Sequence, residues 1–595
     1  IHRLNSFNSL FKHWSDSFLL AERFDYKEFL SKYEVMELEE LARKYALKNA
    51  VDYEGECNPG AVIGQIMSEE DFEPSEVQQI AGKVCGQINS MDLEEQKQAL
   101  EEYEFEEKTH EHDPIPDLDV DDEEQVVVRF APNPNGPPHI GHARGMVING
   151  ELKQKYDGKL ILRFDDTDPR KKRPLKTEEY DAYQMYQEDY EWLGYEVDEV
   201  RYSSKQFDQY IEYAEKLIEK QKAYVCRCSA EDGSDYRSKG EACPHRDRSV
   251  EKNMEEWQGM RDGSVEEGAA TLKIKTDLDH KNPAVRDFVA FRIIDNPDHP
   301  ITGDQYRVWP MLDFAGALED HFMGTTHIVR GKDLRASTKR QKYIYSYFDW
   351  EYPDIRYWGD VQISGFDAPV SGSSLGNLIE EGELSGWDDP RAPTLRALRK
   401  RGFRSEGIRD FFVDMGVSEN DVEASVETLE SFNRDIIDEE ANRYFFVKDP
   451  VELKIKGVPE DIEAEMPLHP DFSERGNRKP GLVREDDTIS VLVEKEDSEE
   501  GFLRLKGLCN LRITAGGEAE YVEGDHTVAL DKNADIVHWV SSDSEDATVV
   551  MPDGSKINGK LEKSDIKEDQ VVQFERFGFV RCDKGTENLF YYTHN

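Results

Sequence analysis

Residues 126–164 alternate a strand, a loop, a helix and a second strand, and this order constrains the fold more than any other feature. Residues 126–130 (VVVRF) and 160–164 (LILRF) are short apolar runs of the kind found in buried strands. A helical stretch separates them, and two strands joined through a helix usually pair in parallel. The sequence therefore predicts an α/β domain with a parallel sheet.

The residue pattern of the rest of the chain changes along its length. Residues 1–100 are predicted to be helical, and residues 101–124 are so acidic that a linker is expected there. Residues 205–222 and 391–440 also read as helical. From residue 443 onward, short β-rich runs are split by Gly and Asp, which is typical of one or two small barrels.

The net charge is strongly negative, with 75 basic and 126 acidic residues giving −51. Such acidity is often a sign of disorder. Because apolar runs and tryptophans recur along the chain, a folded protein with an acidic surface that stays soluble at molar salt is the favoured interpretation. The charge alone argues against a nucleic-acid ligand, but the Debye length falls to about 3 Å at 1 M salt, so local basic clusters matter more there.

Several features indicate a cytoplasmic protein. No apolar run approaches the ~18 residues of a membrane span, so no membrane partner is expected. Seven cysteines are few for 595 residues, which fits a reducing compartment. The first residue is Ile1 rather than methionine, and no signal peptide is recognisable, so a truncated or processed start is expected.

The loop after the first strand, residues 131–142 (APNPNGPPHIGH), ends in a predicted helix N-terminus. Free N–H groups and the positive end of the helix dipole favour an anion there. His139 and His142 are three residues apart and share one face of the first turn, while Gly141 lets a ligand approach closely. This pattern suits stabilisation of a reacting phosphoryl group. A metal pair or two surface histidines are the alternatives.

Further blocks decide between these alternatives. Together with residues 163–169 (RFDDTDP), 309–315 (WPMLDFA), 327–333 (HIVRGKD) and 385–391 (SGWDDPR), the loop resembles the signatures of class I aminoacyl-tRNA synthetases of the glutamyl/glutaminyl branch. The resemblance runs from about residue 40 to the β-rich region. It implies a multidomain α/β fold with a Rossmann-like nucleotide-binding domain, an N-terminal helical domain and C-terminal β-barrels that bind the anticodon.

The resemblance also assigns roles to residues. It makes His139 and His142 the groups that meet the phosphates of ATP, which enters with Mg²⁺. It implies that Arg129 and Arg330 bind the carboxylates of glutamate and that Asp165 binds the substrate ammonium. For each of the three, a structural ion pair is the alternative. The implied ATP contacts are Pro132, Asn133, Gly136, His139, Gly141 and His142 in the first signature and Ser371, Gly372, Ser373 and Ser374 in the second.

The implied reaction is ATP-dependent attachment of L-glutamate to tRNA(Glu) through a glutamyl-adenylate, with no covalent enzyme intermediate. Residues 131–136 (APNPNG) are similar to the glutamyl rather than the glutaminyl form of the first loop. The β-rich C-terminus resembles the archaeal and eukaryotic form, and the acidity suggests a salt-loving archaeon. A monomer is expected. A glutaminyl enzyme remains the alternative, and charging of tRNA(Gln) stays open.

Two departures from the family pattern stand out. Leu312 occupies a position where many relatives carry tyrosine. The second ATP signature usually contains a lysine, whereas residues 370–375 (VSGSSL) contain none. A tRNA-binding paralogue with weakened catalysis is therefore a further alternative. If the enzyme is fast, the basic run 170–173 (RKKR) is the next place to look for the missing charge.

The resemblance divides the chain into seven parts. These are an N-terminal helical domain (1–100), an acidic linker (101–124), the first half of the catalytic fold (125–222), an inserted domain that binds the acceptor stem (223–305), the second half of the catalytic fold (306–375), a helical connection (376–442) and the anticodon-binding barrels (443–595).

A zinc site is the last prediction. Cys226-x-Cys228 and Cys243-x-His245 are separated by 14 residues, and three cysteines with one histidine make a tetrahedral structural set. Some family members have a similar pattern. The spacing of Cys226 and Cys228 is tighter than usual, so free buried cysteines are the alternative. Cys57, Cys85, Cys509 and Cys582 read as isolated core residues.

Overall fold

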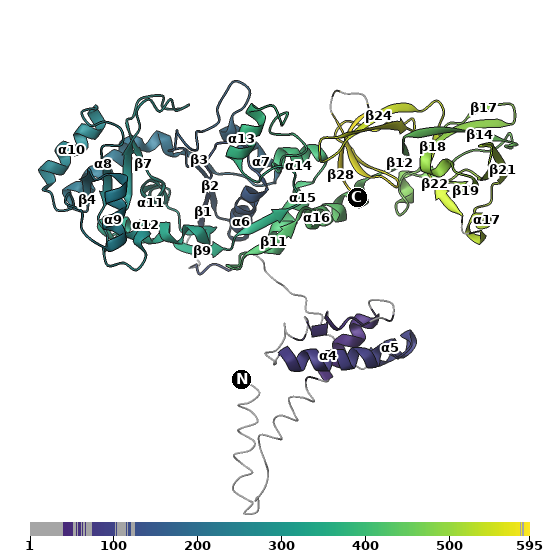
Figure 1. The fold of residues 1–595 in the computed structure, drawn as a ribbon, viewed down its shortest axis with the longest axis horizontal. Helices are drawn as coiled ribbons and strands as arrows, with labels where there is room; N and C mark the ends of the chain where they lie inside the picture. The colour runs from purple at the N-terminus through teal and green to yellow at the C-terminus, as the bar shows by residue number, and fades with distance from the viewer. Residues whose placement is uncertain are drawn as a thin grey trace, which may run out of the picture. The chain divides into compact units, whose positions relative to one another are not determined.

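The computed structural model describes residues 38–595 apart from 39, 52–54, 56, 61, 64–65, 67–73, 101–102, 104–114, 116, 121–124, 533, 584 and 586–587. The chain forms two compact units, Ile1–Asp113 and Pro114–Asn595, which are considered separately (Figure 1). Residues 1–37 and most of the linker expected at 101–124 lie outside the described residues.

The described part of the first unit is helical. Helical residues at 40–51 are followed by α4 (Pro74–Ile88) and α5 (Leu93–Leu100). One face of these helices buries a small apolar core that includes Ala42, Ala46, Val77 and Ala81. Burial of this stripe, more than intrinsic propensity, holds such short helices together.

Two cysteines of this unit depart from the prediction. Cys57 and Cys85 are joined by a disulfide in the structure, with their Cα atoms 5.4 Å apart. The prediction that they are isolated is therefore wrong, because the packing of α4 against the preceding segment brings two thiols together that are 28 residues apart in sequence. Cys509 and Cys582 are free and buried, as predicted.

The second unit begins with the predicted parallel sheet. The strands β1 (Val127–Phe130), β2 (Lys159–Phe164) and β3 (Glu199–Tyr202) pair in parallel, with Arg129 opposite Ile161. The helices α6 (Ile140–Tyr156) and α7 (Ala182–Trp192) follow β1 and β2. This arrangement confirms the α/β prediction and brings the carboxyl ends of β1 and β2 to one edge.

A second parallel pair continues this part of the fold. The strands β8 (His327–Gly331) and β9 (Asp354–Trp358) flank α12 (Arg335–Phe348), and α11 (Leu312–Phe322) precedes them. Thr326, just before β8, hydrogen-bonds to both the N–H and the carbonyl of Val127 in β1. The side chains that β1 and β8 carry therefore lie near each other.

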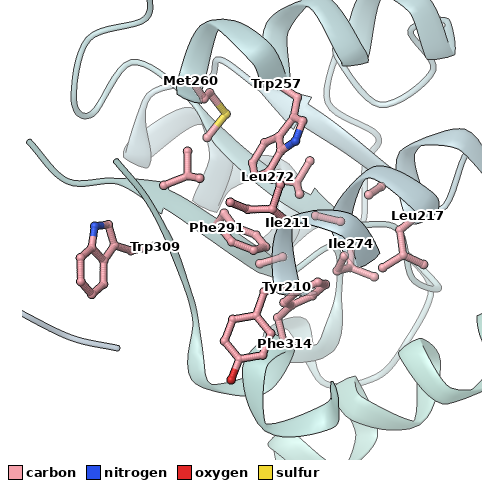
Figure 2. Close-up of a cluster of buried hydrophobic side chains, with 14 of the residues drawn as sticks. Tyr210, Ile211, Leu217, Trp257, Met260, Leu272, Ile274, Phe291, Trp309 and Phe314 are labelled. Atoms are coloured by element: carbon pink, nitrogen blue, oxygen red, sulfur yellow. The ribbon is translucent and has the colours of Figure 1, made fainter. Parts of the chain in front are cut away.

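Between these two parts lies an antiparallel sheet in the order β4-β5-β6-β7, with bounds Ala223–Cys226, Thr271–Ile274, Val289–Ile293 and Val308–Pro310. The helices α8 (Phe207–Glu219) and α10 (Val250–Asp262) pack on it, and α9 (Ala230–Lys239) lies on the same insert. Figure 2 shows the shared core, in which the rings of Trp257 and Phe291 meet edge to face.

The segment predicted to be helical at 391–440 contains three helices, α14 (Leu395–Arg401), α15 (Ser405–Met415) and α16 (Val426–Glu440). A short strand, β11 (Val422–Ser425), interrupts them, so the prediction is wrong there. The cause is tertiary: β11 pairs in parallel with β10 (Val361–Ser364), 61 residues earlier.

The C-terminal region forms two large sheets, as its β-rich sequence predicts, and a short two-stranded sheet of β15 (Met466–Pro467) and β16 (Asn477–Arg478). One has the order β12-β26-β27-β28-β24-β25-β13 (Arg443–Tyr444, Val571–Phe574, Gly578–Cys582, Leu589–His594, Glu545–Val550, Lys556–Leu561, Phe446–Lys448). The other has the order β17-β18-β14-β21-β20-β19-β22 (Val483–Glu485, Thr488–Glu494, Pro450–Lys456, Ala519–Glu523, Asn510–Ile513, Gly501–Leu505, Asp535–Val537), and β23 (Val540–Ser541) pairs with β18. The chain leaves the first large sheet after β13, forms the second and returns to the first at β24, so the two sheets are joined by two crossings.

Within the described part of the chain, every helix is too short or too polar to cross a membrane.

Candidate active site

The two histidines of the first signature meet at the start of α6. His139 is the N-cap residue, and its ring stacks on that of His142 with 3.8 Å between the ring centroids. The hydroxyl of Tyr186 lies 3.1 Å from Nδ1 of His142. A Cβ at Gly141 would lie 3.1 Å from the ring of His139, so the glycine leaves room for the stacked pair.

Burial fixes the charge of this pair. Removal from water lowers the pKa of His139 to about 4, and the positive charge of Lys172 contributes. Burial lowers the pKa of His142 well below its usual value, and His139 and Lys172 contribute. Both rings are therefore neutral at pH 7 and can each donate one N–H to an anion. Nδ1 of His139 is buried and makes no hydrogen bond to a described residue.

The loop before α6 is held by the strand beside it. The N–H of Asp165 donates to the carbonyl of Pro132 (2.9 Å), and the amide of Asn133 donates to the carbonyl of Asp165 (2.9 Å). Gly136 packs against Trp387, where a Cβ would come within 2.8 Å of the ring. Through these contacts, Asn133 and Gly136 fix the shape of the loop.

The second ATP signature lies against the first. Ser371 caps α13 (Gly372–Glu380), since its hydroxyl accepts the N–H of Ser374 at 3.5 Å. The amide of Asn135 donates to the hydroxyl of Ser373 at 2.8 Å. The structure thus brings together two segments more than 230 residues apart, and the second presents hydroxyls and a helix N-terminus without a lysine.

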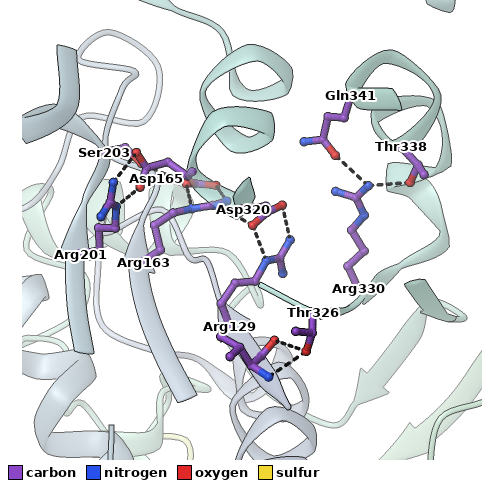
Figure 3. Close-up of polar contacts among 12 residues, drawn as sticks. Arg129, Arg163, Asp165, Arg201, Ser203, Asp320, Thr326, Arg330, Thr338 and Gln341 are labelled. Atoms are coloured by element: carbon purple, nitrogen blue, oxygen red, sulfur yellow. Dashed lines mark hydrogen bonds and ion pairs between the residues drawn. The ribbon is translucent and has the colours of Figure 1, made fainter. Parts of the chain in front are cut away.

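A buried carboxylate organises the predicted glutamate pocket (Figure 3). Asp320 of α11 accepts hydrogen bonds at one oxygen from Nε of Arg129 (3.0 Å) and Nη1 of Arg163 (2.8 Å). Burial alone raises the pKa of Asp320, but Arg129 and Arg163 outweigh it and hold that pKa below its usual value. Asp320 is therefore ionised and fixes two guanidinium groups side by side.

Arg330 approaches the same region from β8. Its Nη2 donates to Thr338 (2.5 Å), Gln341 (3.1 Å) and Tyr352 (3.2 Å), and its charge also stabilises ionised Asp320. Its Nε is buried and makes no hydrogen bond to a described residue. Arg330 therefore holds a fixed orientation and keeps donor capacity for a ligand.

Asp165 is paired rather than free. Nε of Arg163 donates to it at 2.8 Å, and the hydroxyl of Ser203 lies 3.4 Å away. Arg163 connects Asp165 to Asp320, which in turn pairs with Arg129 and is stabilised by the charge of Arg330. The roles of Arg163 and Asp320 were not predicted from the sequence. Arg163 could have been found because it opens the same block as Asp165. Asp320 lies in a helix and gave no sequence signal.

The four residues of the predicted zinc set come together in the inserted domain. Cys226, Cys228, Cys243 and His245 each offer a ligand atom, and these atoms all lie within 4.8 Å of one another. Nδ1 of His245 lies 3.4 Å from Sγ of Cys228 and 3.9 Å from the other two sulfurs. Across the described residues, this is the one such group of three or more His, Cys, Asp or Glu side chains.

Comparison with known families agrees with this geometry. The family model for the catalytic domain of class I tRNA synthetases (E and Q) matches residues 125–439, and the two anti-codon binding models of that family match 441–528 and 536–583. The chain belongs to the class I tRNA synthetases of the E and Q type. The first match spans both histidines and all three arginines of the site.

Individual relatives cover nearly the whole chain. It is 44% identical over 573 residues to a glutamate–tRNA ligase of Pyrococcus furiosus, which covers 92% of this chain and 98% of that protein. It is 43% identical over 582 residues to a glutamate–tRNA ligase of Haloarcula marismortui, covering 93% and 98% respectively. A glutamate–tRNA ligase of Archaeoglobus fulgidus is 43% identical over 568 residues, covering 94% of this chain and all of that protein.

The buried carboxylate gives a first prediction. Replacing Asp320 by asparagine removes the anion that separates Arg129 from Arg163, and loss of one partner from a buried ion pair costs about 3–5 kcal/mol. We expect the free energy of unfolding of Asp320→Asn to fall by that amount in denaturant titrations in molar KCl. Glu351→Gln, at an exposed carboxylate, is the control and should change little. Equal stability of the two variants would show that Asp320 does not hold the site together.

Proposed function

We propose that this chain charges tRNA(Glu) with L-glutamate by way of a glutamyl-adenylate, using ATP as its Mg²⁺ complex. The observation that carries the proposal is the placement of two elements at one edge of the catalytic fold: the stacked histidines at the start of α6 and the arginines ordered around Asp320. The first suits a triphosphate and the second a dicarboxylate. The inferred setting is the cytoplasm of a salt-adapted cell, with the chain acting as a monomer.

Formation of the glutamyl-adenylate requires that the reactants be positioned and that developing charge be stabilised. A carboxylate oxygen of glutamate attacks the α-phosphorus of ATP, and the bond to pyrophosphate breaks as the new P–O bond forms. Neutral His139 and His142 donate N–H groups to the phosphoryl oxygens, where negative charge builds. The ribose hydroxyl at the end of the tRNA then attacks the activated carbonyl and releases AMP. No protein nucleophile takes part in either step.

The histidine pair provides the second prediction. His142→Ala should lower the single-turnover rate of adenylate formation by ~10²-fold or more, with a much smaller change in ATP affinity, because the contact strengthens in the transition state. His526→Ala, at an exposed histidine of the C-terminal region, is the matched control. A rate for His142→Ala equal to that of the control would remove the catalytic role of the pair.

Glutamate recognition follows from the free donors of the arginines. Arg129 uses Nε and Nη2 on Asp320, and Arg330 uses Nη2 on three uncharged acceptors. The Nη1 group of each makes no hydrogen bond to a described residue, so both can address a ligand. Pre-ordered guanidinium groups suit the two carboxylates of glutamate. We propose that Asp165, beside Arg163, faces the substrate ammonium.

The third prediction separates glutamate from glutamine. A neutral side-chain amide would leave a buried guanidinium without its anion, so glutamine should be a very poor substrate in ATP–pyrophosphate exchange and in charging of tRNA. The measurement compares the two amino acids at equal concentration in molar KCl. Comparable rates would overturn the glutamyl assignment in favour of the glutaminyl one.

The C-terminal region offers a site for tRNA. A cavity of about 270 Å³ is lined by strands β12 and β26 of the first sheet, by β15 and by neighbouring loop residues, namely Arg443, Met466, Pro467, Pro470, Lys506, Gln573 and Glu575. Arg443 and Gln573 stand opposite each other on β12 and β26. The donors and acceptors of such side chains suit the edge of an unstacked base. We propose that this cavity takes an anticodon base of tRNA(Glu), whereas charging of tRNA(Gln) stays open.

We also propose that the cysteine cluster binds a structural zinc ion. Cys226, Cys228, Cys243 and His245 form a complete tetrahedral donor set, and their ligand atoms already lie within 4.8 Å of one another. The loops that carry Cys228 and His245 have little apolar core of their own, so a metal would hold them to β4.

The fourth prediction is a metal content of about one zinc per chain. Elemental analysis of the purified protein should find it, and Cys226→Ser should lose it. Cys509→Ser changes a buried cysteine outside the cluster and should keep its zinc. A metal-free chain that remains folded and active would remove the zinc site.

A further inference from the structure

The second ATP signature of this chain lacks a cation, so the positive charge that faces the triphosphate has to come from another element. Ser371 and Ser373 offer hydroxyls there. The hydroxyl of Ser371 already accepts the N–H of Ser374, and the hydroxyl of Ser373 accepts the amide of Asn135. Hydroxyls and a helix N-terminus provide dipoles but no full charge. A pyrophosphate leaving group carries several negative charges at neutral pH.

The basic loop after the Asp165 block is fastened to the first signature. At one end, the N–H of Asp165 donates to the carbonyl of Pro132 at 2.9 Å, and at the other the N–H of Leu175 donates to the carbonyl of Pro134 at 2.8 Å. Residues 166–174 therefore form an excursion whose two ends lie on the loop that leads into the stacked histidines. Residues 170–173 of this excursion are Arg-Lys-Lys-Arg.

Two of these four cations are already committed to the inserted domain. Nη2 of Arg170 donates to the carbonyl of Asp295 at 2.6 Å and lies 3.6 Å from Glu267. Nη2 of Arg173 donates to a carboxylate oxygen of Asp298 at 2.6 Å. These pairs tie the outer part of the loop to the insert and neutralise both guanidinium groups.

The two lysines between them are not committed. The side chains of Lys171 and Lys172 are exposed and make no hydrogen bond or ion pair to any described residue. They differ in their electrostatic effect on the histidine pair. The ammonium of Lys172 is close enough to both histidines to lower the pKa of each, and it is the only one of the four cations with that effect.

We propose that Lys172 supplies the ammonium group that the second ATP signature lacks, by contacting the β- and γ-phosphates as adenylation proceeds. The inference rests on the proposed function. As a carboxylate oxygen of glutamate bonds to the α-phosphorus, the bond to the bridging oxygen breaks and pyrophosphate leaves with its electron pair. Lys172 stays protonated throughout and balances the charge on the leaving group. The clamp at Pro132 and Pro134 holds its backbone in place, and its unpaired side chain reaches the phosphates.

The test compares two lysines of one loop. Lys172→Ala should slow single-turnover adenylate formation by about 10- to 100-fold, the loss expected for one charge-assisted contact. Lys171→Ala removes the same charge one residue away and should stay within about twofold of the parent. Lys172→Arg should keep most of the rate, because it keeps the charge. The deficit of Lys172→Ala should shrink from moderate to molar KCl, where screening is stronger.

A rescue variant tests whether the rate loss of Lys172→Ala comes from the missing charge or from a disturbed structure. Ser374→Lys places an ammonium in the first turn of α13 and, made in the Lys172→Ala background, should restore much of the rate that Lys172→Ala loses. Equal rates of Lys172→Ala and the parent, or equal losses in Lys171→Ala and Lys172→Ala, would overturn this inference and leave the proposed function standing. A folded parent without any exchange would overturn both.

Discussion

Asp320 is one carboxylate in a helix, and the arrangement of the arginines in the proposed glutamate pocket depends on it. It is fully buried and ionised, and it holds Arg129 of β1 and Arg163 of β2 at one of its oxygens. Without that anion, two guanidinium groups and the nearby Arg330 would repel one another in a poorly solvated place. The carboxylate converts this repulsion into a pre-ordered array of donors, and it does so before any ligand arrives. If glutamate binds there as proposed, the pocket needs little rearrangement, which favours a fast and selective first step.

The loop from Pro132 to Gly136 serves the other half of the site. Its backbone carbonyls accept hydrogen bonds from both ends of the basic loop 166–174. Its Asn135 donates to Ser373 at the start of α13, and its Gly136 packs against the ring of Trp387. Segments from three distant parts of the chain therefore meet on one turn. Each contact is modest, but together they hold the basic loop, the start of α13 and Trp387 against the loop that leads into the two neutral histidines. In the proposal made above, Lys172 of the basic loop supplies the charge that the start of α13 lacks.

How far the sequence predicted this structure depends on the range of the contacts involved. The strands at β1 and β2 and the barrels after residue 443 were predictable because local apolar patterning determines them. The clustering of Cys226, Cys228, Cys243 and His245 was predictable from residue type and spacing, and zinc binding there stays a prediction. The strand β11 was missed because its pairing with β10 is a tertiary contact. Asp320, and the bond between Cys57 and Cys85, were missed for the same reason: each has meaning only through a partner far away in sequence. The roles given to Arg129 and Asp165 stay predictions, and the structure adds the partners that orient them.

The net charge of −51 sets the conditions in which the account has to be tested. At low salt the acidic surface repels itself and the tRNA, so activity measured there would reflect folding and association more than chemistry. The most direct measurement is ATP–pyrophosphate exchange with L-glutamate in molar KCl, run with and without tRNA. Glutamate-dependent exchange in at least one of the two conditions is the result that the account predicts. A folded, metal-replete protein that gives no glutamate-dependent exchange in either condition would contradict it.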